Sequence, residues 1–509
     1  MTETSASEIE PLRAKPEKQK NNAFKNIFKS VTVEPTGIIY ITAAMLAMIT
    51  NQTLQLEKAC RVNLNLGDEI CTSLRNQDAN VSSVYEKQAQ TYVAQRLAVK
   101  YVLYSLLPCT ILLFVGAWSD KTGRRIVLMK VPMFADILAT ISTILNVFFF
   151  HALPVEVQIF ADCLIIGCGG GWATFFLGVF SFIGDITSEE NRTYRLGFVQ
   201  FFSFVGIPIG LSLSGVILKR YGYYAVYFTS LTMHILNLIY FIYKLRDPER
   251  TEQQKNHDGK GFCYFLRLFF DFTNIKETVR VVFKDGPNNR RVRICILLGT
   301  VSILFGPMYG EIAVMYMSTR YRFGWDELQF SIYQTYNFVT HTVGTVFSLI
   351  VFSKMLKWHD SVLGIISTSS KIVGSFIYCF AATATVFYIA PLVEILNGTS
   401  LLAMRSIMSK LVAPDELGKV NSIFGLTENL MPLIYVPLYT TVYTRTMDVL
   451  PGAVFLMGAG MSVPAIAVFF WLLYEHRKGV RRLKKEENGV TEPLKGTVEI
   501  PAKVNSDLS

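Results

Sequence analysis

Nine ionisable side chains lie inside long apolar stretches of this sequence. A charge in lipid costs at least about 2.5–3.5 kcal/mol on insertion scales, so each of them predicts a functional or pairing role. Buried carboxylates can carry protons, and an arginine fork can hold an anionic group with two parallel hydrogen bonds. The nine are Asp136, Asp162, Glu311, Lys371, Glu394, Arg405, Glu428, His234 and His341.

Among these, Arg405 and Glu428 stand at similar depth in neighbouring stretches, so they can form an ion pair. Arg405 has two interpretations: substrate or ion-pair chemistry, which we favour, and a side chain that snorkels to the headgroups. For Glu311 a role in substrate or proton chemistry and a structural role are equally supported. Asp136 and Asp162 are expected to be near-interface or inter-helix partners, and the two histidines to be hydrogen-bonded packing residues.

The elements that position these side chains are apolar runs bounded by charge. The chain is 51% hydrophobic and only 17% charged, whereas a soluble protein carries about 25% charged residues. A hydrocarbon core needs about 20 apolar residues in a helix. Twelve runs reach that length: 36–56, 97–119, 126–150, 155–184, 196–218, 224–243, 294–317, 330–353, 361–383, 386–408, 420–443 and 452–474.

The runs fall into two sets of six, which predicts an all-α membrane protein with twelve transmembrane helices as two six-helix bundles. We expect a basic tail at 1–35, bundles at 36–243 and 294–475, a linker at 244–293 and a tail at 476–509. The tails, the linker and the loop at 120–125 hold most of the clustered Lys and Arg. These segments are therefore expected in the cytosol, and the net charge of +10 indicates topology rather than nucleic-acid binding. The linker's Phe-rich middle, 262–272, predicts a helix on the membrane surface.

The loop at 57–96 then lies on the opposite side, where an oxidising compartment permits disulfides. Cys60 and Cys71 both fall in this loop, and a disulfide between them and two free thiols are equally supported. The sequon that begins at Asn80 predicts a glycan there. The cysteines inside the apolar runs, at 109, 163, 168, 295 and 379, are expected to be inert packing residues.

A short basic loop between the second and third runs resembles the signature of the major facilitator superfamily, G-x-x-x-D-[RK]-x-G-[RK]-[RK]. Its first glycine would permit close helix packing and its second a tight turn. The aspartate would pair with basic groups or a helix N-terminus across the interface of the two bundles in one conformation only. The alternative is a basic turn that obeys the positive-inside rule, which the position of the motif disfavours. The matching residues are Gly116, Asp120, Lys121, Gly123, Arg124 and Arg125.

Glycines also cluster in the fourth run, at 167 and 169–171. Small residues at such spacing allow helices to pack closely. A hinge or sliding surface and a static interface are equally supported there.

Several strings resemble the proton-coupled folate transporter family, solute carrier family 46. They include 116–125, 182–185, 192–195, Glu311-Ile312 with Tyr316, and Arg405 ahead of 409–412. The resemblance implies that Arg405 handles substrate and protons. The family's coupling glutamate in the fifth helix is replaced here by Gln200, which cannot titrate. The resemblance still implies transport of organic anions. If coupling to protons persists, Glu311 is the expected coupling residue.

We expect a secondary transporter of a small, organic, anionic solute that works by alternating access and is coupled to protons. An uncoupled facilitator, or a transport-inactive receptor or scaffold on the same fold, are the alternatives. An enzyme is disfavoured because the sequence has no metal cluster, nucleophile triad or phosphate loop at catalytic spacing. We expect no cofactor and no metal, with a small molecule, protons and the bilayer as partners. The expected location is the plasma membrane, with an endolysosomal membrane as the alternative.

Overall fold

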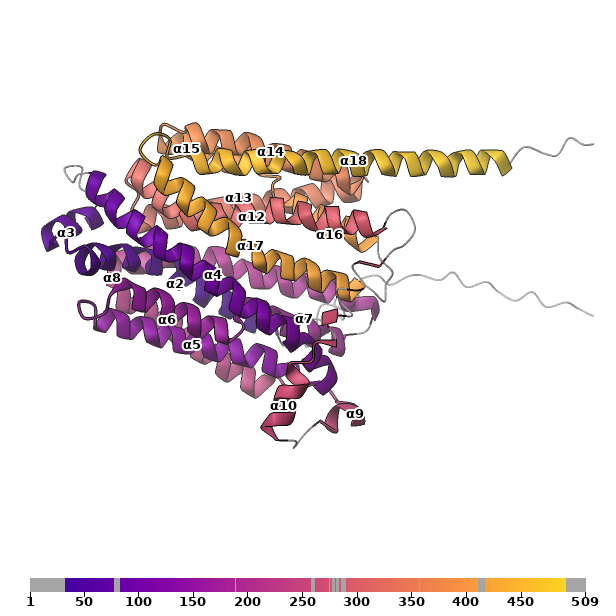
Figure 1. The fold of residues 1–509 in the computed structure, drawn as a ribbon, viewed down its shortest axis with the longest axis horizontal. Coiled ribbons are helices and arrows are strands. Elements are labelled where there is room, and N and C mark those ends of the chain that lie inside the picture. The colour runs from indigo at the N-terminus through magenta and orange to yellow at the C-terminus, as the bar shows by residue number, and fades with distance from the viewer. Residues whose placement is uncertain are drawn as a thin grey trace, which may run out of the picture.

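The computed structural model describes residues 33–76, 83–187, 189–257, 261–273, 275–276, 280, 283–284, 290–356, 358–410 and 417–490. The elements in these segments are helices, and each of the twelve apolar runs lies in them (Figure 1). In chain order they are α2 (Glu34–Lys58), η1 (Ala59–Asn63), α3 (Asp68–Asn76), α4 (Ser83–Thr122), α5 (Ile126–Phe148), α6 (Val155–Cys168), α7 (Gly171–Ile186), α8 (Glu189–Lys244), α9 (Glu252–Lys255), α10 (Phe262–Phe269), α12 (Arg290–Phe323), α13 (Glu327–Ser348), η3 (Leu349–Met355), α14 (Asp360–Phe380), α15 (Ala384–Val393), α16 (Thr399–Lys410), α17 (Leu417–Thr446) and α18 (Ala453–Val490).

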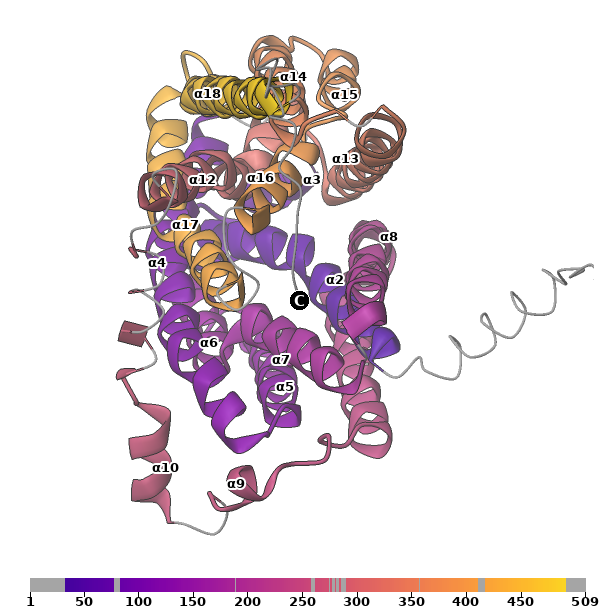
Figure 2. The ribbon, with the colours of Figure 1, turned by 90° about the vertical axis from the view of Figure 1, so that its right-hand side faces the viewer.

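The helices form two halves, which lie one above the other in Figure 2. Elements α2 to α8 make the first half, in which α8 contains the fifth and sixth runs with a kink at Gly222 (φ 79°). Elements α12 to α18 make the second half. Helix α17 packs along α4, and α13 packs along α8, so the two halves touch along two helix pairs.

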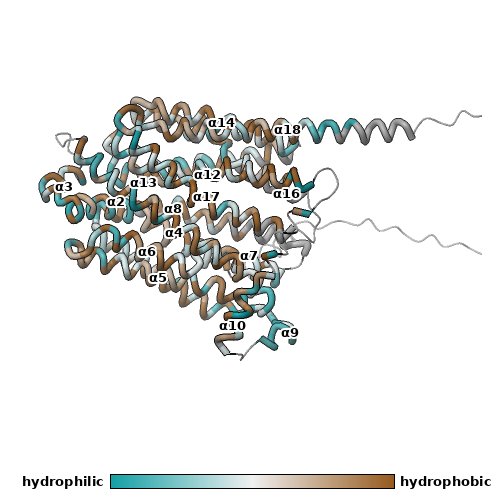
Figure 3. The backbone as a smooth tube through the Cα atoms, viewed as in Figure 1, coloured by the Kyte–Doolittle hydropathy of each residue, from teal (hydrophilic) through white to brown (hydrophobic). Residues whose placement is uncertain are grey.

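Eight helices of the described segments are long and apolar enough to cross a membrane. Helices α13 and α17 are long enough to cross a membrane, but their polar residues make them less apolar than the other eight. Helix α15 is apolar but too short to cross by itself. Figure 3 shows the apolar residues concentrated along the middle of the bundle and hydrophilic ones towards its ends. This distribution suits a protein surrounded by lipid.

We call the end of the bundle that carries α3 the outer end, and the end that carries residues 119–126 the inner end. One apolar core contains residues of both halves near the outer end, such as Leu97 and Tyr316. Nearer the inner end, the core around Met133 belongs to the first half and the core around Met404 to the second. The two halves are therefore packed together at the outer end and have separate cores towards the inner end.

Two membrane-crossing segments are broken, and each is the fourth of its half. The break between α6 and α7 uses glycines with positive φ, Gly170 at 82° and Gly171 at 57°. In the second half, α15 ends at Val393 and α16 begins at Thr399. Ser367 and Ser370 of α14 donate to backbone carbonyls at this second break, at O···O distances of 2.7–2.8 Å. Neighbouring hydroxyls commonly satisfy a broken helix in this way.

The linker contains the expected aromatic helix, α10, beside the inner end of α4 (Figure 2). Phe265 and Phe269 pack edgewise or tilted on Trp118 and Phe114, with ring centroids 5.8–6.4 Å apart. Phe272, just after α10, is exposed. The placement of this segment on a membrane surface stays a prediction.

Candidate functional site

The middle of the second half contains a buried cluster of charged side chains from four segments. Lys371 of α14 lies at the centre, with its ammonium 2.6 Å from Glu311 Oε2 of α12 and 3.3 Å from Glu394 Oε2. Glu394 directly follows α15, at the break in the tenth segment. His341 of α13 approaches the other oxygen of Glu394, with Nε2 3.3 Å from Oε1. The four residues thus form a chain of contacts across α12, α14, α15 and α13.

The three charged members are almost completely excluded from solvent: Glu311 is 5% exposed, Lys371 8% and Glu394 3%. Two carboxylates share one ammonium, so the ionised cluster carries one net negative charge when His341 is neutral. Such a charge is costly where little water can reach it. The cluster can therefore accept one further proton and become neutral.

Tyrosines surround this cluster on the side towards the outer end. Tyr333 of α13 donates a hydrogen bond to Tyr378 of α14 at 2.9 Å, and both rings are buried. Gly374 leaves just enough room for Glu394, because a Cβ built on it would lie 2.9 Å from the glutamate Cβ. The carboxylates are thus positioned by close packing as well as by charge.

Of the residues predicted for substrate or coupling, Glu311 is in this cluster. Arg405 lies on α16 and Gln200 on α8, but their side chains are outside the described residues. Glu428 lies on α17 and is half-buried. Whether Arg405 pairs with Glu428 stays a prediction.

The sequence predicted a functional or pairing role for Lys371 and Glu394 without naming their partners, and a packing role for His341. The available signal was the presence of opposite charges in the seventh, ninth and tenth runs. Buried charges in lipid need partners, so a cation in the ninth run should have been matched with the carboxylates of the other two.

In the first half, Asp162 of α6 is buried and accepts a hydrogen bond from Thr143 of α5 at 2.9 Å. This contact joins two helices of one half, as expected for an inter-helix partner. His234 packs edgewise on Tyr40, with ring centroids 6.1 Å apart. These side chains are consistent with roles in packing.

The signature loop is held by residues of its own half and of the linker. Arg125 pairs with Asp120 at 2.6 Å and with Asp185 at 2.8 Å. Lys121 pairs with Asp271, just beyond α10, at 2.5 Å. Hydrogen bonds from Lys121 and Thr273 hold the pKa of the Asp271 carboxyl below its usual value, so this pair persists at neutral pH. Asp120 therefore pairs within the loop here, and the predicted contact across the bundle interface stays a prediction for another conformation.

Glycine is required at the turn of the signature loop. Gly123 has a φ of 68°, which side chains disfavour. A Cβ there would also lie 2.7 Å from Gln254 Oε1 and 2.9 Å from Arg250 Cγ. Gly116 is less constrained, with its Cβ position 3.5 Å from Leu177, and Arg124 occupies the turn itself. The expected tight turn at Gly123 is thus present.

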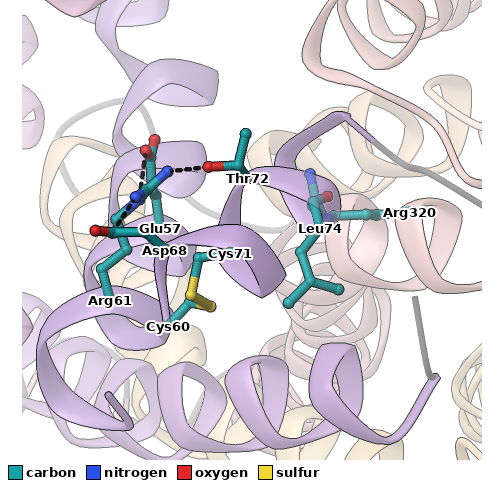
Figure 4. Close-up of a disulfide and its surroundings, with 8 residues drawn as sticks. All are labelled: Glu57, Cys60, Arg61, Asp68, Cys71, Thr72, Leu74 and Arg320. Carbon is teal, nitrogen blue, oxygen red and sulfur yellow. Dashed lines mark hydrogen bonds and ion pairs between the residues drawn. A yellow bond between two sulfur atoms is a disulfide. The ribbon is translucent and has the colours of Figure 1, made fainter. Parts of the chain in front are cut away.

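At the outer end, Arg320 of α12 joins the two halves through a buried ion pair. Its Nε lies 2.7 Å from Glu86 Oε1 of α4, with side-chain exposures of 5% and 12%. Arg320 also donates to the Leu74 carbonyl of α3 (Figure 4). The hydrogen bond of Thr53 with Tyr316, at 2.9 Å, lies nearby. These contacts exist only while the outer ends of the halves are together.

A disulfide between Cys60 and Cys71 ties α3 to η1 beside this contact (Figure 4). The Cα atoms of the two cysteines are 5.9 Å apart. Because α3 supplies the carbonyl that Arg320 contacts, the disulfide fixes one partner of the outer closure. Asn80, the predicted glycan site, lies outside the described residues. No group of three or more potential metal ligands occurs in the described part of the chain.

Comparison with known proteins places this geometry in context. A family model described as Major Facilitator Superfamily matches residues 95–436. The lysosomal proton-coupled steroid conjugate and bile acid symporter SLC46A3 of Gallus gallus is 25% identical over 463 residues, covering 87% of this chain and 94% of that protein. The probable peptidoglycan muropeptide transporter SLC46 of Drosophila melanogaster is 22% identical, covering 84% of each chain. The proton-coupled folate transporter of Rattus norvegicus is 22% identical, covering 70% of this chain and 73% of its own.

Solved structures share the fold at low sequence identity. The human organic anion transporter MFSD10 (TETRAN) superposes with a TM-score of 0.57 at 15% identity, over 86% of this chain and 98% of its own. The xylose transporter XylE from E. coli gives a TM-score of 0.58 at 15% identity, over 87% and 95%. The predicted fold of two six-helix bundles is confirmed.

Proposed function

Because the chain belongs to the major facilitator superfamily, a family of secondary transporters built from two six-helix halves, we propose that it is a proton-coupled symporter of a small organic anion. It is a multi-pass membrane protein that moves a solute by alternating access. The proposal concerns the coupling ion, the solute and the residues that handle them.

The observation that carries the proposal is the cluster of Glu311, Lys371 and Glu394. Three buried charges that sum to minus one favour the uptake of a proton, because a buried unpaired charge is far more costly than a neutral acid. The two carboxylates differ in their contacts: Glu394 is approached by both Lys371 and His341, whereas Glu311 Oε1 has neither a hydrogen bond nor an ion pair among the described residues. We therefore assign the coupling proton to Glu311.

Protonation of Glu311 would change the balance of contacts around Lys371. The ammonium now lies nearer to Glu311 than to Glu394, at 2.6 Å against 3.3 Å. A neutral Glu311 attracts it less, so Lys371 would move towards Glu394. Since Glu394 stands at the break between α15 and α16, this shift would act on the most easily bent part of the second half. The proton and the conformation are linked in that way.

The solute is assigned to Arg405, which follows the same break on α16. Two of the relatives are named for steroid conjugates, bile acids and folate, and these are organic anions. An arginine fork suits a carboxylate or sulfate because it donates two parallel hydrogen bonds. Glu428 of α17 would hold Arg405 when no solute is bound. The net charge of the Glu311 cluster makes it unsuited to hold the anion itself.

An uncoupled facilitator is the second candidate, because Gln200 occupies the position at which the proton-coupled folate transporter family has its coupling glutamate. The two candidates differ in their response to a pH gradient. A facilitator equilibrates its solute whatever the gradient, whereas a symporter concentrates it from the acidic side.

The test is uptake into transport-null cells at two external pH values, with labelled estrone sulfate, taurocholate, folate and a muropeptide as probes. We expect acid-stimulated uptake of at least one anion, with loss of the acid stimulation in Glu311→Gln. Asp162→Asn is the matched control, because it neutralises a buried carboxylate in the other half. Acid stimulation that survives Glu311→Gln at normal protein abundance contradicts the assignment.

The membrane in which the protein resides is part of the proposal. We expect the plasma membrane. An endolysosomal membrane is the alternative, because several relatives are named as lysosomal transporters. Surface biotinylation compared with co-localisation on lysosomal markers separates the two.

A further inference from the structure

Two of the buried polar atoms near the Glu311 cluster have neither a hydrogen bond nor an ion pair in the described part of the chain. They are Glu311 Oε1 of α12 and the hydroxyl oxygen of Tyr439 of α17. Glu311 is 5% exposed and Tyr439 is fully buried. An unpartnered polar group inside a protein is costly, and such groups commonly share an ordered water.

Both oxygens face the same place on α18. A Cβ built on Gly458 would lie 2.6 Å from Glu311 Oε1 and 2.8 Å from the Tyr439 hydroxyl. The two oxygens are therefore no further apart than the sum of these distances, yet they do not form a direct hydrogen bond. Two oxygens within this limit that do not bond each other directly can share one water molecule.

The ring of Tyr439 cannot easily turn away from this place. A Cβ built on Gly310, the residue before Glu311, would lie 2.3 Å from the Tyr439 ring. The absence of side chains at Gly310 and Gly458 thus lets the tyrosine stand close to α12 and α18. Its hydroxyl is held at a fixed position relative to the carboxylate.

The other titratable groups around Glu311 are already engaged. Lys371 of α14 contacts Oε2, and His341 of α13 contacts Glu394. Helix α18 contributes Gly458, which cannot titrate, and α17 contributes Tyr439. Oε1 is thus the oxygen of this carboxylate that can take a proton without breaking an ion pair first.

We propose that a water molecule bound between Tyr439 and Glu311 Oε1 delivers the coupling proton to Glu311, with Tyr439 as a positioning residue. A proton that reaches this water makes hydronium, which passes one proton to Oε1 and becomes water again. The carboxylate becomes a neutral acid, and the reverse transfer releases the proton. Tyr439 keeps its own proton throughout and orients the water through its hydroxyl. This inference rests on the proposed role of Glu311 as the proton carrier.

The test needs no transported solute, because it follows the proton itself. The full-length protein in lipid nanodiscs is titrated over about pH 4 to 8, and the infrared C=O band of protonated carboxyl groups is recorded. The part of this band that is missing in Glu311→Gln belongs to Glu311. Exchange into H₂¹⁸O identifies any water band that changes together with it.

Two pairs of variants then examine the bridge. Tyr439→Phe removes the hydroxyl, and Tyr435→Phe is its control one turn earlier on α17. Gly458→Ala places a methyl group against both oxygens, and Gly460→Ala is its control, because a Cβ there meets nothing within 4 Å. We expect the Glu311 band to move and its titration midpoint to shift by about one pH unit in Tyr439→Phe, as for loss of one hydrogen bond. Gly458→Ala should shift the band and the midpoint in the same direction as Tyr439→Phe. In the two controls, Tyr435→Phe and Gly460→Ala, the band and the midpoint should be those of the unmodified protein.

The outcomes separate the inference from the proposed function. If Glu311→Gln removes no band at any pH, Glu311 does not take up the proton and both fail. A Glu311 band that stays at the same frequency and midpoint in Tyr439→Phe overturns the water bridge alone. A band that moves equally in Tyr435→Phe also overturns it, because the effect then comes from general packing of α17.

Discussion

The buried pair between Arg320 and Glu86 should decide how strongly the outer end stays closed. Arg320→Met removes the guanidinium and leaves Glu86, whose side chain is 12% exposed, without its cation. Breaking one side of a buried ion pair costs about 3–5 kcal/mol. In the outward-open state both groups would be hydrated, so most of this cost falls on the closed state. A shift of about 3 kcal/mol changes the ratio of the two states by roughly 150-fold.

Double electron–electron resonance can measure that shift directly. Spin labels at Val84 and Val449 suit the purpose, because both are exposed, at 55% and 89%, and stand at the outer ends of the two halves. The six free cysteines are first replaced, so that only the labels and the disulfide remain. We expect one short distance in the parent protein and a dominant longer distance in Arg320→Met.

Lys219 provides the matched control for this experiment. It pairs with Asp326 across the same interface at 2.6 Å, but its side chain is 54% exposed. Exposed pairs contribute about 0–1 kcal/mol, so Lys219→Met should leave the short distance dominant. The reasoning is refuted if Arg320→Met keeps the short distance, or if Lys219→Met lengthens it as much.

Further predictions concern the signature loop, the solute site and the outer loop. Gly123→Ala should lower the free energy of unfolding by about 1–2 kcal/mol, because φ is positive there, and thermal unfolding in detergent measures it; an unchanged midpoint would speak against strain at the turn. Arg405→Lys should raise the apparent Km for the anion about tenfold, since the charge stays but the fork is lost, and uptake kinetics at normal surface abundance would show an unchanged Km if Arg405 only snorkels. Asn80→Gln should abolish a glycosidase-sensitive mass shift on gels, and its survival would mean that another site is used. Replacing Cys60 and Cys71 by serine should lower the outer-closed population in the resonance experiment, whereas an identical distance distribution would show that α3 needs no disulfide.

The fold could be predicted from the sequence because run length is a local property. A run of twenty apolar residues bounded by charge can be recognised without knowing which helices pack against it. The signature loop, between the second and third runs, then indicated the superfamily to which this arrangement of runs belongs. The two breaks were harder to foresee. The glycines of the fourth run suggested the first, and the pair Asn397-Gly398 is a local turn signal for the second. The sequence does not show that Ser367 contacts the carbonyls of this break.

The site could be predicted only in part because ion pairs join residues far apart in the chain. Glu311 and Lys371 are 60 positions apart, and the helix faces that bring them together are set by packing. Each charge could be identified as costly and in need of an opposite charge, but the sequence alone does not show which carboxylates face Lys371. Asp120 differs in this respect, because it pairs in this structure with Arg125 of its own loop at 2.6 Å.

The two helix breaks also bear on how such a protein arises. Each interrupts the fourth segment of a six-helix half, α6–α7 in the first and α15–α16 in the second. A gene for six helices that duplicates in tandem carries one interruption into both copies. The copies then differ at the interruption itself, which holds glycines in the first half and the carboxylate of Glu394 beside it in the second. The interrupted place thus contains glycines with positive φ in one half, whereas in the other half it supplies a carboxylate to the charge cluster.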